Sequence, residues 1–150
     1  MINEIKFPKA ELHFDYTFNG GQAFRYVLLT HSQLLWFISN DILYLFRWKS
    51  LGDGKWMGVF SHSVWKLWQD NDTIFYEVYK SSKSSQDNEK TLREYLRLDE
   101  PLSSLYEEWS ECDRMFKEAA KKFTGVRMLK QDPVEIIFTF ICSSNNNIAR

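Results

Sequence analysis

The sequence predicts an α+β fold in which an antiparallel sheet precedes a set of helices. Short runs rich in Trp, Tyr and Phe alternate with turn residues as far as Tyr79, whereas from Thr91 onward the apolar residues recur with helical spacing. A chain of 150 residues is long enough to bury one core. Its aromatic content of 17% is typical of a small domain that fills this core with large rings.

The first half of the chain reads as strands. The alternation of Leu12, Phe14, Tyr16 and Phe18 predicts a strand that ends in a turn at 19–21. Between Trp48 and Tyr79 we expect an antiparallel meander, because aromatic runs at 56–60, 64–68 and 74–79 are separated by turns at 52–54 and 70–72.

The second half reads as helices. The Ser-rich, polar stretch 81–90 predicts a mobile loop, followed by short helices over 91–98 and 102–109. Asp113 can cap a third helix that ends at Gly125, and Asp132-Pro133 starts a fourth. In the third helix we expect the inward-facing residues to be Phe116, Ala119, Ala120 and Phe123.

Net charge and cysteine content limit which partners, disulfides and metal sites the sequence can predict. The net charge of −1 does not by itself indicate a nucleic-acid partner. Six basic residues lie between Arg114 and Lys130, and a solvated helix face is favoured for most of them over phosphate contacts. Cys112 and Cys142 are too few and too distant for a disulfide framework or a zinc site, so we expect packed, reduced thiols in an intracellular protein.

The segment from Tyr26 to Arg47 differs from its surroundings. Its 22 largely apolar residues would suit a membrane-spanning helix in length, but the polar residues that interrupt it make spanning unfavourable. A buried hairpin is one alternative. Our preferred hypothesis is a retained in-frame intron, because joining Arg25 to Trp48 restores a continuous strand, and the codons at both ends can carry intron boundary sequences in the same phase.

Two motifs carry a resemblance to a known family. Residues 21–25, Gly-Gln-Ala-Phe-Arg, completed by Trp48, resemble the GQxFRW signature of eukaryotic 8-oxoguanine DNA glycosylases. The run from Phe123 through Gly125-Val126-Arg127 and Gln131-Asp132-Pro133 to Arg150 is longer and compositionally unusual. The chain is therefore identified as similar to the N-terminal part of this glycosylase and AP lyase family.

The resemblance implies a fold and a biological setting. We expect a twisted sheet like one repeat of the TATA-binding protein over residues 1–130, with 26–47 as an insertion, and the first helix of a helix-hairpin-helix domain over 131–150. The implied function is base-excision repair of DNA in the nucleus, with the mitochondrion as a second compartment. The implied partner of a monomeric chain is double-stranded DNA with 8-oxoguanine opposite cytosine; no cofactor, metal or membrane is expected.

The resemblance also assigns site residues. Asn145 and Arg150 are expected to contact the cytosine left unpaired when the damaged base is flipped out, since an amide and a guanidinium satisfy its hydrogen-bonding edge. Asn146 and Asn147 would belong to the loop that fills the vacated stack. Gly21 would offer its carbonyl to the N7 hydrogen that distinguishes 8-oxoguanine from guanine. From the residues alone, a polar helix cap and a turn glycine stay open as alternatives.

The expected chemistry needs a nucleophilic lysine and an assisting aspartate. The family places both in the helix-hairpin-helix region, after the position of Arg150, and Lys55 and Lys66 lack the matching motif. We therefore assign no catalytic residue and expect no glycosylase activity from these 150 residues. The alternatives are a non-catalytic module that binds damaged DNA and a non-functional gene-model fragment.

Overall fold

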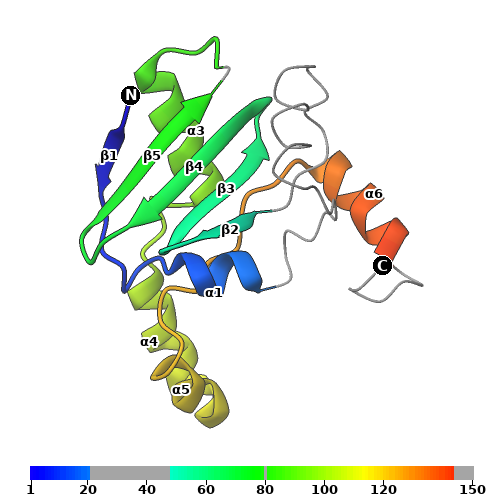
Figure 1. Cartoon of the computed structure of the whole chain (residues 1–150). Coiled ribbons are helices and arrows are strands. Elements are labelled where there is room, and N and C mark those ends of the chain that lie inside the picture. Colours follow the sequence, from blue (N-terminus) through cyan, green and yellow to red (C-terminus); the bar gives the residue numbers. More distant parts are fainter. Residues whose placement is uncertain (21–47, 80, 144–150) are drawn as a thin grey trace.

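A computed structural model describes residues 1–20, 48–79 and 81–143, and it confirms the α+β organisation (Figure 1). Five antiparallel strands form one sheet in the order β1-β5-β4-β3-β2. The strands are β1 (Asn3–Lys6), β2 (Lys49–Gly52), β3 (Lys55–Phe60), β4 (Ser63–Gln69) and β5 (Thr73–Tyr79). The helices are α1 (Phe14–Asn19), α3 (Ser85–Leu96), α4 (Leu102–Cys112), α5 (Arg114–Ala120) and α6 (Pro133–Ser143).

The predicted meander is present, and its turns have clear chemical causes. Gly52, Asp53 and Gly54 all have positive φ, so two glycines stand where other residues would be strained. Between β3 and β4, Ser61 and His62 also have positive φ (48° and 57°), the backbone of a two-residue hairpin turn. At the β4–β5 turn, the Asp70 carboxylate accepts hydrogen bonds from the backbone N–H groups of Asp72 and Thr73.

Large aromatic rings fill the space between the sheet and helices α1 and α3. Phe18 of α1 stacks on Trp48 with ring centroids 4.3 Å apart, and Tyr95 of α3 stacks on Phe60 at 3.9 Å. Trp65 and Tyr76 are also fully buried in this cluster. The aromatic content noted in the sequence is thus largely a core property in this half of the chain.

Two of the predicted elements are wrong. Residues 14–19 form helix α1 rather than a strand, because the buried side chains Phe14, Thr17 and Phe18 follow helical and not alternate spacing. The expected mobile loop over 81–90 contains the beginning of α3, from Ser85 onward. Ser84 caps this helix by accepting a hydrogen bond from the Asp87 N–H, a signal that the polar composition concealed.

The remaining helices begin where predicted, but α5 ends at Ala120 rather than at Gly125, and not all of the predicted faces are right. Asp113 caps α5 through the N–H groups of Met115 and Phe116, as expected. However, α5 has no buried residue, and Ala119 and Phe123 are exposed rather than inward-facing. Cys112 is exposed too, contrary to the packed thiol expected. None of the described helices is long and apolar enough to cross a membrane, and segment 26–47 lies outside the described residues.

Candidate functional site

The residues that the sequence assigned to the lesion and to the cytosine lie outside the described residues. They are Gly21, Asn145, Asn146, Asn147 and Arg150. The described structure contains the elements next to them in the chain, namely α1 with Gly20 before Gly21, Trp48 after residues 21–47, and α6 before Asn145. The site can therefore be characterised through the framework that holds these elements.

Trp48, the last residue of the first motif, is a core residue. Its ring lies flat on Gly58, where an added Cβ would come within 2.6 Å of the indole carbon Cδ2. Its Nε1 donates a hydrogen bond of 2.9 Å to the Tyr95 hydroxyl of α3, and its ring also stacks on Phe18 of α1. The chain before and after residues 21–47 is thus fixed to the same core.

The second motif crosses the end of α1 as an extended segment. Gly125, Arg127 and Leu129 are buried, whereas Val126 and Met128 between them are exposed. The Gly125 carbonyl accepts hydrogen bonds from the His13 N–H (2.8 Å) and from the Thr17 hydroxyl (3.2 Å). Gly125 has φ +73°, and a Cβ there would lie 2.7 Å from the His13 nitrogen, so only glycine fits.

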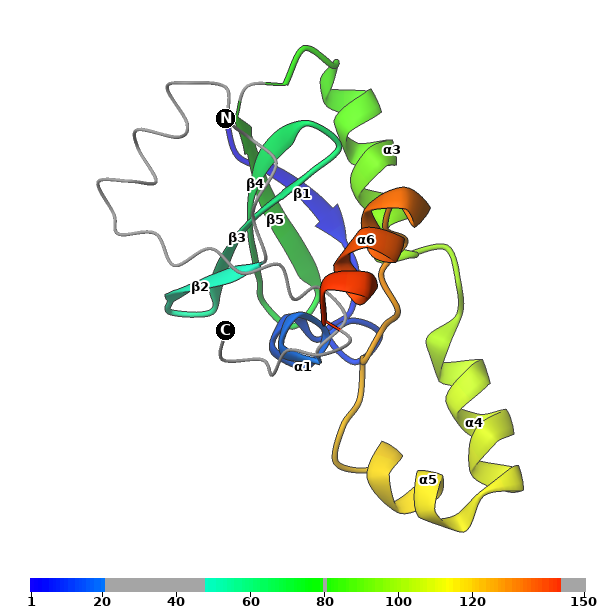
Figure 2. The ribbon, with the colours of Figure 1, turned by 90° about the vertical axis from the view of Figure 1, so that its right-hand side faces the viewer.

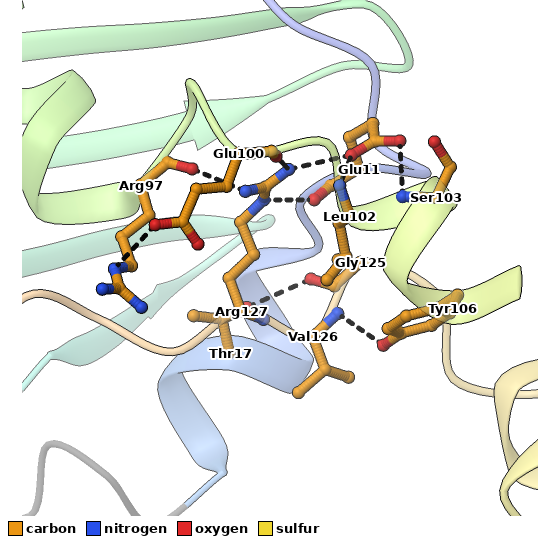
Figure 3. Close-up of polar contacts among 10 residues, drawn as sticks. All are labelled: Glu11, Thr17, Arg97, Glu100, Leu102, Ser103, Tyr106, Gly125, Val126 and Arg127. Atoms are coloured by element: carbon orange, nitrogen blue, oxygen red, sulfur yellow. Dashed lines mark hydrogen bonds and ion pairs between the residues drawn. The ribbon is translucent and has the colours of Figure 1, made fainter. Parts of the chain in front are cut away.

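The Arg127 side chain lies where the second motif meets the segment before α1, the end of α3 and the start of α4 (Figure 3). We call this meeting point the junction. It is only 3% exposed, and its guanidinium donates four hydrogen bonds of 2.6–2.9 Å. The acceptors are the backbone carbonyls of Glu11, Arg97 and Glu100 and the carboxylate of Glu11. One buried cation thus joins the segment before α1, the end of α3 and the start of α4.

Glu11 balances this buried charge and also holds α4. Its carboxylate oxygens accept hydrogen bonds from the first N–H groups of α4, those of Leu102 (3.0 Å) and Ser103 (3.1 Å). Burial opposes ionisation of Glu11, but these hydrogen bonds and the charge of Arg127 outweigh it and lower its pKa. Burial lowers the pKa of Arg127, and Glu11 opposes that effect. At neutral pH the two form an ion pair.

The junction is connected to the Trp48 site through α3. The N–H of Lys130, just before α6, donates a hydrogen bond of 2.9 Å to the Tyr95 carbonyl. Tyr95 is the residue whose hydroxyl holds Trp48. We call Glu11, Thr17, Tyr95, Gly125 and Arg127 the Arg127 framework. It holds together α1, which leads to Gly21, the core around Trp48, and the segment 125–130, which leads to α6.

Arg127 was overlooked in the sequence, where it was one of six basic residues assigned to a solvated face or to phosphates. No alternation in the sequence could have singled it out, because the exposed residues of this segment are the apolar Val126 and Met128, whereas Arg127 is buried. Its partner Glu11 is too far away in sequence to be identified by pattern. Lys121, by contrast, behaves as expected, because it is exposed and pairs with Glu118 at 2.7 Å.

Other candidate residues have structural roles. Lys66, which was not assigned as a nucleophile, pairs with Glu77 across the sheet at 3.3 Å and lies over the Trp68 ring. Over residues 1–20, 48–79 and 81–143, no group of three or more His, Cys, Asp and Glu side chains could hold a metal ion.

Comparison with known proteins identifies the family. Residues 4–137 match the sequence profile described as "8-oxoguanine DNA glycosylase, N-terminal domain". The N-glycosylase/DNA lyase OGG1 of Arabidopsis thaliana is 36% identical over 124 residues, which is 81% of this chain and 34% of that protein. The chain therefore spans about a third of the length of this relative.

Solved structures share the fold. MBOgg1, solved in complex with a low-affinity DNA ligand, aligns with a TM-score of 0.74 and 24% identity over 99% of this chain and 42% of its own. The 8-oxoguanine glycosylase/lyase of Clostridium acetobutylicum, solved with double-stranded DNA containing cytosine opposite 8-oxoguanine, aligns with a TM-score of 0.69 and 22% identity, covering 99% of this chain and 44% of that one. On this evidence the chain belongs to the 8-oxoguanine DNA glycosylase family, whose N-terminal domain it contains.

Proposed function

We propose that this chain is the DNA-binding N-terminal portion of a base-excision repair glycosylase that acts on 8-oxoguanine opposite cytosine in the nucleus. The family to which the chain belongs functions in base-excision repair. The observation that carries the proposal is the Arg127 framework, in which α1, the element before Gly21, is tied by hydrogen bonds from Thr17 and to Thr17 to Gly125 and Arg127 of the segment that leads to α6.

A rigid framework suits this function because the two proposed contacts address the two halves of one base pair. Gly21 would contact the flipped lesion, while Asn145 and Arg150 would satisfy the unpaired cytosine and Asn146 and Asn147 would fill the gap. Errors of about 1 Å in such an arrangement are costly. Hydrogen bonds of 2.6–3.3 Å join the segment that leads to α6 to Thr17 of α1 and to Glu11 just before α1, and they would limit such errors.

Glycosidic bond cleavage, in this proposal, depends on a lysine nucleophile that none of the lysines here matches. The chain would accordingly bind damaged DNA without cleaving it. Binding by these residues could therefore be measured without interference from cleavage.

The test measures binding of the purified chain to two labelled duplexes by fluorescence anisotropy. The duplexes differ at one position only, where one has 8-oxoguanine and the other has guanine opposite cytosine. We expect tighter binding to the lesion duplex and an affinity that falls with added salt. Asn145→Ala should weaken binding to the lesion duplex by about 1–3 kcal/mol. Asn71→Ala, an exposed amide in the β4–β5 turn, is the matched control and should have no effect.

Two results would contradict the proposal. Equal binding to both duplexes would mean that the chain does not distinguish 8-oxoguanine from guanine. A covalent adduct after borohydride trapping with the lesion duplex would show that these residues contain a nucleophile after all.

A further inference from the structure

His13 immediately precedes α1, a helix that lies beside the segment joining α5 to α6 (Figures 1 and 2). Its backbone N–H donates a hydrogen bond of 2.8 Å to the Gly125 carbonyl, and its own carbonyl accepts one of 3.0 Å from the Thr17 N–H. Its imidazole ring stacks on Tyr16 of α1, with the ring centroids 4.1 Å apart. His13 is therefore one of the residues that attach α1 to the second motif.

The imidazole ring of His13 has one buried nitrogen without a partner. The side chain as a whole is 19% exposed, but its Nδ1 is buried and makes no hydrogen bond within the described part of the chain. Buried polar atoms in native proteins are nearly always paired, so an exception needs a physical explanation. An unpaired nitrogen is least unfavourable when the ring is neutral, because no charge is then buried with it.

The carboxylate of Asp15 lies near this nitrogen but beyond hydrogen-bond distance. Its Oδ2 is 4.0 Å from Nδ1, whereas its Oδ1 accepts a hydrogen bond of 3.2 Å from the Trp56 indole Nε1. A protonated imidazole carries a hydrogen on both ring nitrogens. Protonation of His13 would thus create a charged N–H donor in a buried position that offers it no acceptor, which is unfavourable.

The surroundings of the ring also act on its charge, in opposite directions. Burial disfavours the protonated ring most, the positive charge of Lys9 disfavours it further, and the negative charge of Asp15 favours it. The first two effects outweigh the third, so the pKa of His13 is lowered from its ordinary value of 6.5. The remaining neighbours are the Tyr16 ring and the backbone of Gly125. Geometry and charge therefore agree that this arrangement favours the neutral ring.

We propose that His13 is a pH-sensitive switch in the attachment of α1 to the second motif, closed while its ring is neutral and opened by protonation of Nδ1. Above the ordinary value of 6.5 the attachment has its full stability. As the pH falls below that value, an open or unfolded chain binds the proton more readily than the closed one, so stability is lost until the pH passes the lower pKa of the closed state. The proposal does not rest on DNA binding, and its test contains no DNA.

The test follows His13 in the 150-residue chain from about pH 7.5 to about pH 5, the range in which histidine titrates. The ring signals of His13 in NMR spectra should titrate with a midpoint below 6.5. The hydrogen-exchange protection factor of the His13 amide, which is bonded to Gly125, should fall over the same range. The protection factor of the Leu67 amide in β4 should fall less, because Leu67 lies in the core of the sheet.

Four variants locate the effect. His13→Gln cannot be protonated, so protection of the amide at position 13 should no longer depend on pH in this range. Lys9→Gln should raise the titration midpoint of the His13 ring, and Asp15→Asn, which keeps an acceptor for Trp56, should lower it. His62→Asn is the matched control, because it replaces an exposed histidine in the β3–β4 turn with a residue that tolerates positive φ, and it should change nothing at His13.

Three results would overturn the inference. One is a titration midpoint of the His13 ring at or above 6.5. Another is a protection factor at His13 that falls no more than that at Leu67, which would mean that acid acts on the whole fold rather than on this attachment. The last is an undiminished pH dependence in His13→Gln. The first two measurements use the unsubstituted chain, so they do not depend on how the variants fold.

Discussion

The sheet with its covering helices and the α4–α5 hairpin use aromatic residues in opposite ways. In the sheet region, rings such as Phe18, Trp48 and Trp65 are buried and stack on one another. In the hairpin, Trp109 and Phe116 make similar ring contacts but stay partly exposed. Similar composition therefore produces a closed core in one region and an open surface in the other.

The difference shows where this domain is self-sufficient and where it is not. The sheet region gains its stability from burial, whereas the hairpin is attached to it through Glu11 and Arg127 at the start of α4. Substitutions that act on the core, on this attachment or on the hairpin itself should thus have very different consequences for stability.

Substitutions at the attachment of the hairpin, which Glu11 and Arg127 form, should lower the free energy of unfolding most. Arg127→Leu would remove the donor of four hydrogen bonds and leave the Glu11 carboxylate without its cation. We expect a loss of about 3–5 kcal/mol in the free energy of unfolding, measured by denaturant titration. Lys121→Leu also removes a cation from an ion pair, but an exposed one, and should cost within about 0.5 kcal/mol. Similar losses in both variants would disprove the role of the junction.

The two aromatic clusters should respond differently to the same truncation. Phe18→Ala removes a ring that is fully buried against Trp48 and Trp56, at a cost of about 3–5 kcal/mol. Phe116→Ala removes a ring that only meets Tyr106 and Trp109 edge-on, so about 1 kcal/mol is expected. Equal losses in thermal unfolding would mean that the hairpin has a core of its own.

A pair of glycines isolates steric fit from backbone conformation. Gly54 and Gly125 have similar positive φ (68° and 73°), but a Cβ at Gly54 meets nothing within 4 Å, whereas one at Gly125 meets backbone at 2.7 Å. Gly54→Ala should cost about 1 kcal/mol from conformation alone. Gly125→Ala should cost roughly 3 kcal/mol, because the segment must also move away from His13. Matching unfolding midpoints for the two variants would show that the segment at Gly125 can move to accommodate the added methyl group.

These comparisons also explain what could be predicted from the sequence. The strands between Trp48 and Tyr79 were predictable because their turns contain Gly and Asp at positions that local chemistry dictates. Helix α1 was not, since Phe14 and Phe18 fit both an alternating and a helical pattern over so short a segment. Arg127 could not be separated from its basic neighbours, because its burial depends on Glu11, 116 residues away.

The Tyr26–Arg47 segment provides a test of how independent the sheet region is. Its described flanks are already joined by the Phe18–Trp48 stack. Deleting residues 26–47 shortens the connection between Gly20 and Trp48 from 27 to 5 residues, and loop entropy alone then predicts a gain of about 1.5 kcal/mol. A higher unfolding midpoint would support the retained-intron hypothesis, whereas a lower one would mean that the segment packs as part of the domain.

The smallest effect concerns the pH dependence of the attachment. The pKa of Glu11 is lowered in the folded chain despite burial, by hydrogen bonds from α4 and by Arg127. Its ionised form therefore stabilises the fold above the ordinary value of 4.5, and this contribution is lost as the pH falls through the lower, folded-state pKa. The difference in unfolding free energy between the original chain and Glu11→Gln should consequently be largest near neutral pH and shrink below about pH 4.5.

Glu118 is the matched control for this titration. Its pKa is also lowered, by a hydrogen bond from Lys121 and by that residue's charge, but it is fully exposed on the hairpin. Water and salt screen such a pair. Glu118→Gln should follow the curve of the original chain closely, and 1 M salt should remove any remaining difference while leaving most of the Glu11 effect. If salt instead abolished both effects, the Glu11–Arg127 contact would be no better protected from solvent than the hairpin surface.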